Sequence, residues 1–569
     1  MHPLLQINKL QIGFVSNSGI EKAVQNSSFT IAKGTLVAIV GESGSGKSVT
    51  ALSLLQLLPK QANINGDILF SEDGIQQLNL VNLSDKEINN IRGNKISMIF
   101  QEPMTSLNPV YTCGYQVREA LMQHKKLSKK QARQKTIELF EQVSLPNPTT
   151  MLNRYPHQLS GGQKQRVMIA MAMSCNPALL IADEPTTALD VRVQKSILQL
   201  IKNLQKQNHL SVLLITHDLS LVADVADEII VMYKGEIVEH GNTKDILKNP
   251  KHNYTKALLA CKPGAFSKGK KLSVINDFLT GSEILYPEEN KKNITDIPGN
   301  FSFSEPVLTV QNLCVHFPVS KNIFGKTTSV FKAVDDISFT VNKNEIIGLV
   351  GESGCGKTTL GRAILHLIKP TAGKILLQGK DIAALNEQQL RVVRKNLQIV
   401  FQDPYGSLNP RISIGDAIME PLKVHDFYNN KKHRKQKVVE LLDKVSLNAG
   451  HYNRYPHQFS GGQRQRICIA RALALNPSFL IFDESVSALD VSVQAQVLNL
   501  INELKTQLNF TAIFISHDLS VVHYISDRIL VMNKGKIAEE GTADEIYFNP
   551  KNEYTQQLIA AIPGKSFII

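Results

Sequence analysis

The chain has few cysteines, no long apolar run and no sign of a secretion signal. Its six cysteines are scattered through 569 residues and form no CxxC pair, so they offer neither a zinc nor an iron–sulfur ligand set and indicate a reducing compartment. The longest uncharged stretch, 167–182, has 16 residues, whereas a membrane-spanning helix needs about 20. The N-terminus lacks a basic region followed by an apolar core. We therefore expect a soluble, cytosolic chain that does not cross a membrane by itself.

Basic residues outnumber acidic ones, 63 Lys and Arg against 50 Asp and Glu, which gives a formal net charge of +13. Such a balance favours nucleic acid or an anionic membrane surface as a partner. Two short runs, 125–135 and 431–437, hold much of the excess. Neither is interleaved with aromatic residues that could stack on bases. We interpret both runs as solvated helix faces and expect no nucleic-acid partner.

The chain is an internal repeat with a period of about 300 residues. GESGSGKS at 41–48 returns as GESGCGKT at 351–358, and RYPHQLSGGQKQR at 154–166 returns as RYPHQFSGGQRQR at 454–466. The polar stretch between the copies lacks a helical or strand period and resembles a linker with a short ordered element at its middle. We therefore predict a first domain at 1–265, a linker at 266–304 and a second domain at 305–569.

The apolar pattern predicts an α/β fold in each copy. Short runs rich in Val and Ile end at the glycine-rich motifs or recur later in each copy, at 36–40, 179–182, 212–215, 346–350, 479–482 and 512–515. They are too short for helices, and helical stretches follow most of them, which is typical of a mainly parallel sheet. An antiparallel β subdomain is expected at 4–30 and 308–340, and a helical subdomain at 110–160 and 411–460.

Each copy carries GxxxxGK[ST] directly after a predicted strand, the pattern of a phosphate-binding loop. Glycines let successive backbone N–H groups point into one concavity, and the following helix N-terminus adds positive potential. The lysine is expected to bridge the β- and γ-phosphates, and the Ser or Thr hydroxyl to bind Mg²⁺. The predicted phosphate-binding residues are Gly41, Ser43, Gly44, Gly46, Lys47 and Ser48 in the first copy and Gly351, Ser353, Gly354, Gly356, Lys357 and Thr358 in the second.

A carboxylate pair ends a later strand in each copy, Asp183-Glu184 and Asp483-Glu484. The aspartate suits Mg²⁺, because this metal prefers oxygen ligands and keeps part of its hydration shell. The glutamate is then free to orient an attacking water or to accept its proton. Such a pair alone could be a turn or a helix cap, but its combination with the phosphate loop favours a nucleotide-hydrolysing site.

Further motifs resemble those of ATP-binding-cassette (ABC) ATPases. LSGGQ at 159–163 and FSGGQ at 459–463 look like the signature of this family, and the resemblance covers both copies. It implies that Gln101 and Gln402 serve catalysis and the metal, and that His217 and His517 contact the γ-phosphate. It further implies nucleotide contacts by the signature residues, the D-loop aspartates and two adenine-stacking aromatics, namely Ser160, Gly161, Gly162, Gln163, Ser460, Gly461, Gly462, Gln463, Asp190, Asp490, Phe14 and Phe317.

The resemblance also implies that two ATP molecules are bound in a head-to-tail sandwich. The phosphate loop of one copy would face the signature of the other, so that ATP binding closes the pair and hydrolysis releases it. Both copies keep the glutamate, the histidine and the signature, and we predict two hydrolytically competent sites. Departures are small: Ser485 stands where the first copy has Pro185, and Cys355 where it has Ser45.

A closer resemblance concerns the dipeptide/oligopeptide/nickel importer subfamily, which also includes importers of glutathione and microcin C. It is carried by FQEPMTSLNP at 100–109, FQDPYGSLNP at 401–410, RYPHQ before each signature, and the trailing motifs at 250–255 and 550–555. The resemblance implies a peripheral subunit at the cytoplasmic face of the inner membrane. Its partners would be two polytopic permease subunits and an extracytoplasmic solute-binding protein.

The importer resemblance sets three further expectations. Segments 102–109 and 403–410 are candidates to receive a coupling helix from the permeases. Some relatives carry a C-terminal cysteine cluster for an iron–sulfur centre; here only Cys261 lies in that region, so we expect no cluster. Peptide is the expected cargo, with nickel or an oligosaccharide as alternatives.

Two other classes of cassette protein fit less well. A soluble tandem-cassette ATPase acting on ribosomes would use the positive charge, but that group usually carries a long charged helical connector. The stretch 266–304 is too short and too poor in helical period for one. A DNA-repair cassette ATPase would need zinc-binding cysteine insertions, which the sequence lacks.

Overall fold

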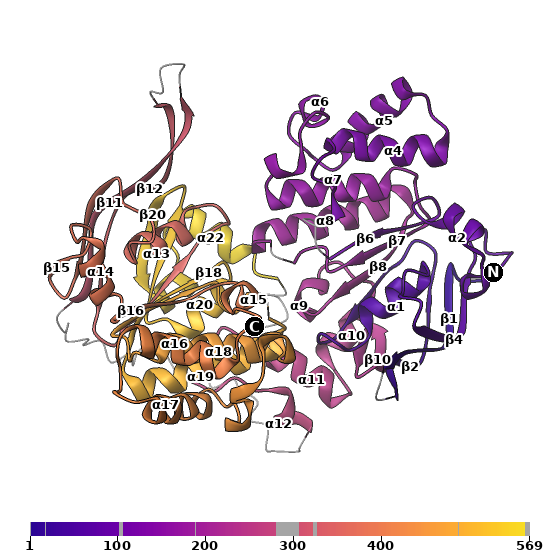
Figure 1. Cartoon of the computed structure of the whole chain (residues 1–569). Helices are drawn as coiled ribbons and strands as arrows, with labels where there is room; N and C mark the ends of the chain where they lie inside the picture. The colour runs from indigo at the N-terminus through magenta and orange to yellow at the C-terminus, as the bar shows by residue number, and fades with distance from the viewer. Residues whose placement is uncertain are drawn as a thin grey trace. The chain divides into compact units, whose positions relative to one another are not determined.

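The computed structural model describes residues 2–16, 19–101, 106–187, 189–279, 306–321, 327–487 and 489–563. They belong to two compact units, both drawn in Figure 1. Unit 1 is Met1–Cys261 with Ile275–Ser282 and Pro563–Ile569, and unit 2 is Lys262–Val274 with Glu283–Ile562. Most of the predicted linker, 280–304, lies outside the described residues.

The strands of unit 1 are β1 (Leu5–Ser16), β2 (Gly19–Ile31), β3 (Leu36–Val40), β4 (Ala62–Phe70), β5 (Leu78–Asn79), β6 (Ile96–Ile99), β7 (Leu179–Asp183), β8 (Ser211–Thr216), β9 (Glu228–Tyr233) and β10 (Glu236–Asn242). They form a six-stranded sheet of order β10-β9-β3-β8-β7-β6 and a four-stranded sheet of order β2-β1-β4-β5. The larger sheet is parallel except for the pair β9–β10, and the smaller one is antiparallel. Strands β3, β7 and β8 are buried along their whole length, which explains their continuous apolar sequence.

The helices of unit 1 are α1 (Lys47–Leu54), α2 (Asp85–Ile91), α4 (Cys113–Lys125), α5 (Lys129–Gln142), α6 (Pro148–Met151), α7 (Gly161–Met173), α8 (Val191–Asn208), α9 (Leu219–Val222), α10 (Thr243–Lys248), α11 (Asn253–Ala260) and α12 (Ile275–Leu279). Side chains of Thr112, Ser128 and Ser160 cap α4, α5 and α7 by accepting a backbone N–H of the first turn. Helix α7 packs against α4, α5 and β6, and therefore joins the helical subdomain to the sheet (Figure 1).

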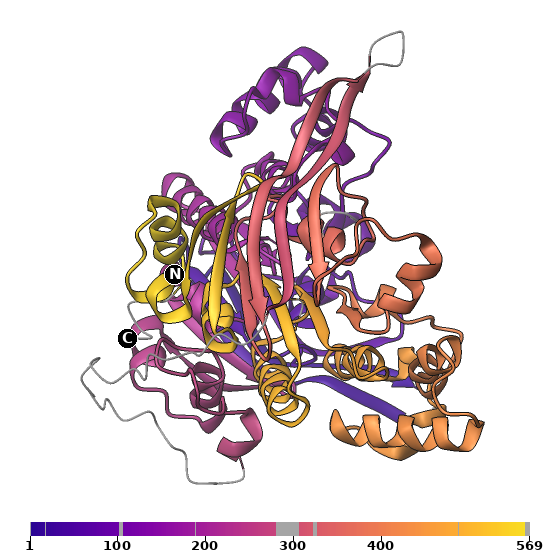
Figure 2. The same cartoon turned by 90° about the vertical axis from the view of Figure 1, so that its left-hand side faces the viewer.

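Unit 2 repeats this plan. Its strands are β11 (Pro306–Lys321), β12 (Thr327–Asn342), β13 (Ile346–Val350), β14 (Ala372–Leu377), β15 (Lys380–Asp381), β16 (Leu397–Val400), β17 (Phe479–Asp483), β18 (Thr511–Ser516), β19 (Arg528–Asn533) and β20 (Lys536–Thr542). The sheets have the orders β16-β17-β18-β13-β19-β20 and β12-β11-β14-β15. Strands β11 and β12 form a long antiparallel hairpin, prominent in Figure 2. The helices are α13 (Lys357–Ile364), α14 (Glu387–Val393), α15 (Pro404–Ser407), α16 (Ile414–Val424), α17 (Lys431–Lys444), α18 (Gly461–Leu473), α19 (Val491–Leu508), α20 (Leu519–Ile525), α21 (Ala543–Phe548) and α22 (Glu553–Ala560).

One apolar core in each unit joins the two sheets. In unit 1 it includes Ile12 of the antiparallel sheet and Ile39, Ile181 and Leu213 of the parallel sheet, each at most 1% exposed. Burial of one such side chain stabilises the fold by about 1.5–3 kcal/mol. The carboxyl ends of β3, β7 and β8, where the predicted site residues follow, are therefore fixed by a rigid core.

The predicted α/β class is confirmed. The expected strands at 36–40 and 346–350 coincide with β3 and β13, and the expected helical stretches contain α4–α6 and α16–α17. The basic runs lie largely on exposed faces of α5 and α17. None of the helices in the described ranges is long and apolar enough to span a membrane.

Candidate active sites

The phosphate loop of unit 1 joins β3 to α1 and encloses its lysine. Gly46 has φ 98°, and a Cβ there would lie 2.6 Å from the carbonyl oxygen of Ala23, so glycine is required at this turn. Lys47 is 5% exposed, and its Nζ donates to the carbonyl oxygens of Gly41 and Glu42, both at 2.7 Å. The ammonium thus points into the concavity of the loop, beside the N-terminus of α1, where an anion is favoured.

A hydroxyl and a carboxylate meet beside this loop. Ser48 Oγ donates to Asp183 Oδ1 at 3.0 Å and so connects α1 to the end of β7. Burial raises the pKa of Asp183 to about 6, and the charge of Glu184 acts in the same direction. Both groups offer oxygen atoms, the ligands that Mg²⁺ prefers. These residues therefore fit this ion, whose positive charge would favour the ionised aspartate.

Glu184 lies at the centre of a hydrogen-bonded group. Gln101 Nε2 and Thr187 Oγ1 donate to its Oε2 at 3.0 and 2.9 Å, and His217 Nδ1 lies 3.3 Å from its Oε1. Burial acts to raise the pKa of Glu184, but the hydrogen bond and charge of His217 lead the opposing effects, which lower it to about 2. Its backbone has φ 45°, a conformation that costs about 1–3 kcal/mol for a residue other than glycine. The carboxylate is thus ionised and held where it can orient a water molecule.

Unit 2 builds the same loop and carboxylate arrangement. Lys357 Nζ donates to the carbonyl oxygens of Gly351 at 2.7 Å and Glu352 at 2.9 Å. Thr358 Oγ1 donates to Asp483 Oδ1 at 3.0 Å. Burial again raises the pKa of this aspartate. The second copy therefore offers the same oxygen ligands to a divalent cation.

Glu484 is contacted by a glutamine and a histidine at the positions that correspond to those around Glu184. Gln402 Nε2 donates to its Oε2 at 3.0 Å, and His517 Nδ1 lies 3.6 Å from the same oxygen. Burial opposes ionisation, but the hydrogen bond and charge of His517, with the charge of Lys357, lower its pKa. Each unit thus brings together the predicted loop lysine, hydroxyl, carboxylate pair, glutamine and histidine.

The predicted signature residues form a second group at the start of α7 and α18. Ser160 caps α7 by accepting the N–H of Gln163 at 3.3 Å. A Cβ on Gly162 would lie 2.8 Å from Val193 Cγ1 of α8, so this glycine lets the two helices approach closely. Asp190 caps α8 by accepting the N–H of Val193 at 3.0 Å. Unit 2 repeats the serine cap and the close glycine contact with Ser460, Gly462 and Val493.

Two tyrosines hold the phosphate loops, and sequence reasoning missed this contact. The N–H of Glu42 donates to Tyr254 Oη at 2.9 Å, and the N–H of Glu352 donates to Tyr554 Oη at 3.1 Å. Both tyrosines belong to the trailing motifs at 250–255 and 550–555. Their recurrence was the available signal, but the sequence alone does not show that α11 and α22 reach the loops.

The predicted adenine-stacking aromatics lie in different surroundings. Phe14 packs against the core of unit 1, whereas Phe317 is 39% exposed and pairs across the hairpin with Phe331. A cavity of about 210 Å³ beside the second phosphate loop is lined by Phe331 together with Ser353, Gly354 and Cys355. Sequence reasoning did not single out Phe331, which stands where unit 1 has Glu21.

The segments expected to receive coupling helices are described in part. Residues 102–105 lie outside the described residues. In unit 2 the segment contains α15, where Tyr405 is 64% exposed. The Arg464 guanidinium lies 3.7 Å from the centre of the Tyr405 ring, and Arg471 Nη1 donates to the carbonyl oxygen of Ser407 at 2.6 Å. Two arginines of the signature helix α18 therefore anchor this exposed segment.

Known families match both units. The family described as ABC transporter matches residues 24–187 and 334–487, and the family described as oligopeptide/dipeptide transporter, C-terminal region, matches residues 238–278. Each ABC match contains a phosphate loop and a carboxylate pair of the geometry given above. Fold and site thus define an ATP-binding ATPase with two cassettes. The chain belongs to the ABC transporter family, and it carries the C-terminal region of the oligopeptide/dipeptide branch.

Curated relatives extend over nearly the whole chain. The glutathione import ATP-binding proteins GsiA of Salmonella choleraesuis and Salmonella typhimurium are 46% identical to it over 564 residues. GsiA of Escherichia coli K12 is 46% identical over 568 residues. Each comparison covers 98% of this chain and 89% of the relative.

Proposed function

We propose that this chain is the ATP-hydrolysing subunit of an ABC importer for small peptides, a class that includes glutathione. The observation that carries the proposal is the match of residues 238–278 to the oligopeptide/dipeptide transporter C-terminal region. The glutathione import ATP-binding proteins GsiA, 46% identical over 98% of the chain, support the same cargo class. The chain would act at the cytoplasmic face of the inner membrane, bound to two permease subunits and, through them, to a solute-binding protein.

Each cassette would position one ATP and one Mg²⁺ with its own residues. In the first, Lys47 would hold the phosphates, and Ser48 and Asp183 would hold the metal together with Gln101. The ionised Glu184 would orient the attacking water or take its proton, while His217 would contact the γ-phosphate. The short contacts among these side chains support the assignment. Their counterparts in the second cassette are Lys357, Thr358, Asp483, Gln402, Glu484 and His517.

The signature residues would complete each site from the other cassette. The N-termini of α7 and α18, with their glycines, would present backbone N–H groups to a phosphate. ATP would then join the cassettes head to tail, and hydrolysis would release them. This alternation is the step that would drive the permeases.

The first test is purification of the chain from its native cells in mild detergent, followed by mass spectrometry of the proteins that accompany it. The proposal predicts two polytopic membrane proteins together with a solute-binding protein. Ribosomal proteins and RNA in their place would support the alternative of a ribosome-associated tandem-cassette ATPase and would overturn the transport proposal.

The cargo is tested by uptake in cells that lack the chain. Labelled glutathione and a labelled dipeptide should enter normally when the wild-type chain is supplied. They should not enter with the Glu184→Gln/Glu484→Gln double variant, which should still associate with the membrane subunits. Uptake of both compounds at the wild-type rate without the chain would contradict the peptide assignment.

A further inference from the structure

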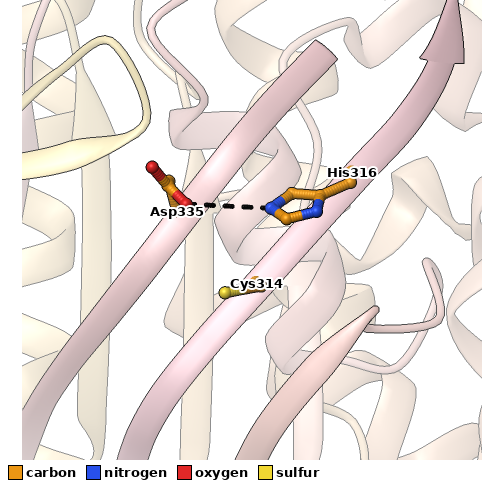
Figure 3. A group of neighbouring side chains, drawn as sticks. All are labelled: Cys314, His316 and Asp335. Atoms are coloured by element: carbon orange, nitrogen blue, oxygen red, sulfur yellow. Dashed lines mark ion pairs between the residues drawn. The ribbon is translucent and has the colours of Figure 1, made fainter. Parts of the chain in front are cut away.

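A cysteine, a histidine and an aspartate face one another on the β11–β12 hairpin of unit 2 (Figure 3). Cys314 and His316 are two positions apart on β11, so their side chains leave the same face of the strand. Asp335 lies on the neighbouring strand β12. The Sγ, ring-nitrogen and carboxylate-oxygen ligand atoms all lie within 4.8 Å of one another.

One ring nitrogen of His316 faces this cluster (Figure 3). His316 Nε2 is buried without a hydrogen-bond partner among the described residues, although most buried polar atoms have one. It lies 3.8 Å from Asp335 Oδ1. Cys314 Sγ, half-buried, accepts the N–H of Asp336 at 3.3 Å. An imidazole nitrogen, a sulfur and a carboxylate oxygen therefore converge on one point.

We propose that Cys314, His316 and Asp335 form a Zn²⁺ site on the second cassette. Zn²⁺ binds thiolate, imidazole and carboxylate, and sites with three protein ligands keep a fourth position for water. The Cys314 thiol loses its proton on binding, and the proton passes to solvent. The expectation of no zinc site rested on the absence of paired cysteines, whereas this set combines a Cys-x-His pattern with an aspartate from the next strand.

Asp335 forms ion pairs with two lysines, and Zn²⁺ binding would have to break them. Lys332 Nζ lies 3.3 Å from Oδ1 and Lys536 Nζ lies 3.6 Å from Oδ2. Both lysine side chains are more than half exposed, at 53% and 66%, so they can turn into solvent. Their charges oppose a cation, and removal of Lys536 should therefore strengthen Zn²⁺ binding.

The first cassette supplies an internal control. Its strands carry Gln11, Gly13 and Gln25 at the positions of Cys314, His316 and Asp335. None of the three is a usual Zn²⁺ ligand. The proposal therefore predicts one site per chain, although the chain contains two cassettes.

The site is connected to the second nucleotide cavity. The N–H of Asp335 donates to the carbonyl oxygen of Gly535 at 2.8 Å, and Gly535 and Lys332 both line the cavity beside the phosphate loop. We therefore expect bound Zn²⁺ to change the nucleotide affinity of the second cassette. This consequence rests on the proposed ATPase function, whereas metal binding itself does not.

The test is titration of the full-length chain with Co²⁺ and Zn²⁺ in excess Mg²⁺, which competes for the oxygen ligands of the nucleotide sites. One equivalent of Co²⁺ should produce a thiolate-to-metal charge-transfer band. Zn²⁺ should displace the Co²⁺ and so remove the band. Cys314→Ser should abolish the band, and His316→Gln should weaken Zn²⁺ binding at least tenfold. Gln11→Ala, at the matching position of the first cassette, should change neither, and Lys536→Ala should tighten binding.

Three results would overturn the site. They are the absence of a charge-transfer band in the wild type, a band that persists in Cys314→Ser, and equal Zn²⁺ affinity in wild type and His316→Gln. A Zn²⁺ site with unchanged ATP affinity at the second cassette would contradict only the link to the nucleotide cavity. Because Cys314→Ser is isosteric and the three side chains are only partly buried, both variants should fold, which circular dichroism verifies.

Discussion

In unit 1 the Thr187 hydroxyl donates to the Glu184 carboxylate at 2.9 Å, whereas in unit 2 the hydroxyl of Ser487, at the corresponding position, donates to the backbone carbonyl oxygen of Glu484 at 2.9 Å. The charge of the loop lysine lowers the pKa of the glutamate in both units. The glutamine contact to each glutamate is the same, at 3.0 Å. The phosphate-facing groups are thus duplicated, while the partners that surround the glutamate differ.

The antiparallel subdomains differ more than the phosphate loops. Unit 2 has Phe331 beside its loop, where unit 1 has Glu21, and it carries a Cys-His-Asp cluster where unit 1 has Gln11, Gly13 and Gln25. Phosphate and Mg²⁺ require fixed geometry, whereas a nucleoside base can be held by many apolar surfaces. We therefore expect the two proposed ATP sites to share their phosphate chemistry and to differ in what surrounds the base.

The largest expected effect comes from removing either glutamate charge. Glu184→Gln and Glu484→Gln keep the hydrogen-bonding shape but remove the carboxylate that acts on water, a contribution of about 10²–10⁴-fold. Each variant should lower steady-state ATP turnover and accumulate a closed, ATP-bound form. Unchanged activity in either variant, measured by phosphate release, would mean that only the other cassette hydrolyses ATP.

Metal binding at the first cassette should depend on pH because the pKa of Asp183 is raised. Below about pH 6 its carboxylate takes up a proton, so Mg²⁺ affinity at the first cassette should fall by about tenfold per pH unit. Binding of Mn²⁺ as a paramagnetic substitute, measured in an Asp483→Asn background that removes the matching carboxylate of the second cassette, gives this profile. Constant affinity between pH 7 and pH 5 would contradict the role given to Asp183.

The Phe331 ring beside the second phosphate loop should make the binding of the adenine base differ between the two cassettes. Phe331→Ala should weaken ATP binding at the second cassette by about tenfold, because stacking of a base on an aromatic ring contributes about 1–3 kcal/mol. Phe317→Ala tests the residue predicted from the family resemblance, which lies on the opposite strand, and a larger loss there would favour Phe317 as the stacking residue. Fluorescent-nucleotide titration in a Lys47→Ala background measures the second site selectively.

The tyrosines that hold the loops should have a smaller effect. Tyr254→Phe and Tyr554→Phe each remove the acceptor of one backbone N–H, a loss of about 1 kcal/mol or about fivefold in ATP affinity. The effect should be larger for Tyr254, which is fully buried. Equal affinity of wild type and both variants would show that the loops hold their shape without these contacts.

The smallest effect on activity is expected from the cysteine in the second loop. Cys355→Ser restores the residue of the first loop and should leave ATP turnover within about twofold, as expected for a substitution without a lost interaction. Alkylation of Cys355 should nevertheless block the second site, and ATP should protect it. Burial raises the pKa of this thiol, so labelling should speed up with rising pH. Labelling that ATP does not slow would contradict its place in the site.

The parts of the site that belong to a motif, or lie next to one in the sequence, could be predicted from the sequence. The strand ends at Val40 and Asp183 and the loops that follow them could be predicted from apolar runs and glycine spacing. The bond from Glu42 to Tyr254 could not, because it joins residues 212 positions apart. For the same reason the sequence did not predict the place of Phe331 or the cluster at Cys314. Their neighbours are set by the register of β11 against β12 rather than by spacing along one strand.

The central claim is that one chain contains two complete ATP sites. The most direct measurement is the number of ATP molecules retained by the Glu184→Gln/Glu484→Gln double variant after rapid gel filtration with Mg²⁺. The account predicts two ATP per chain, falling to one when Lys47→Ala or Lys357→Ala is added. One ATP per chain in the double variant, lost with only one of the lysines, would contradict it.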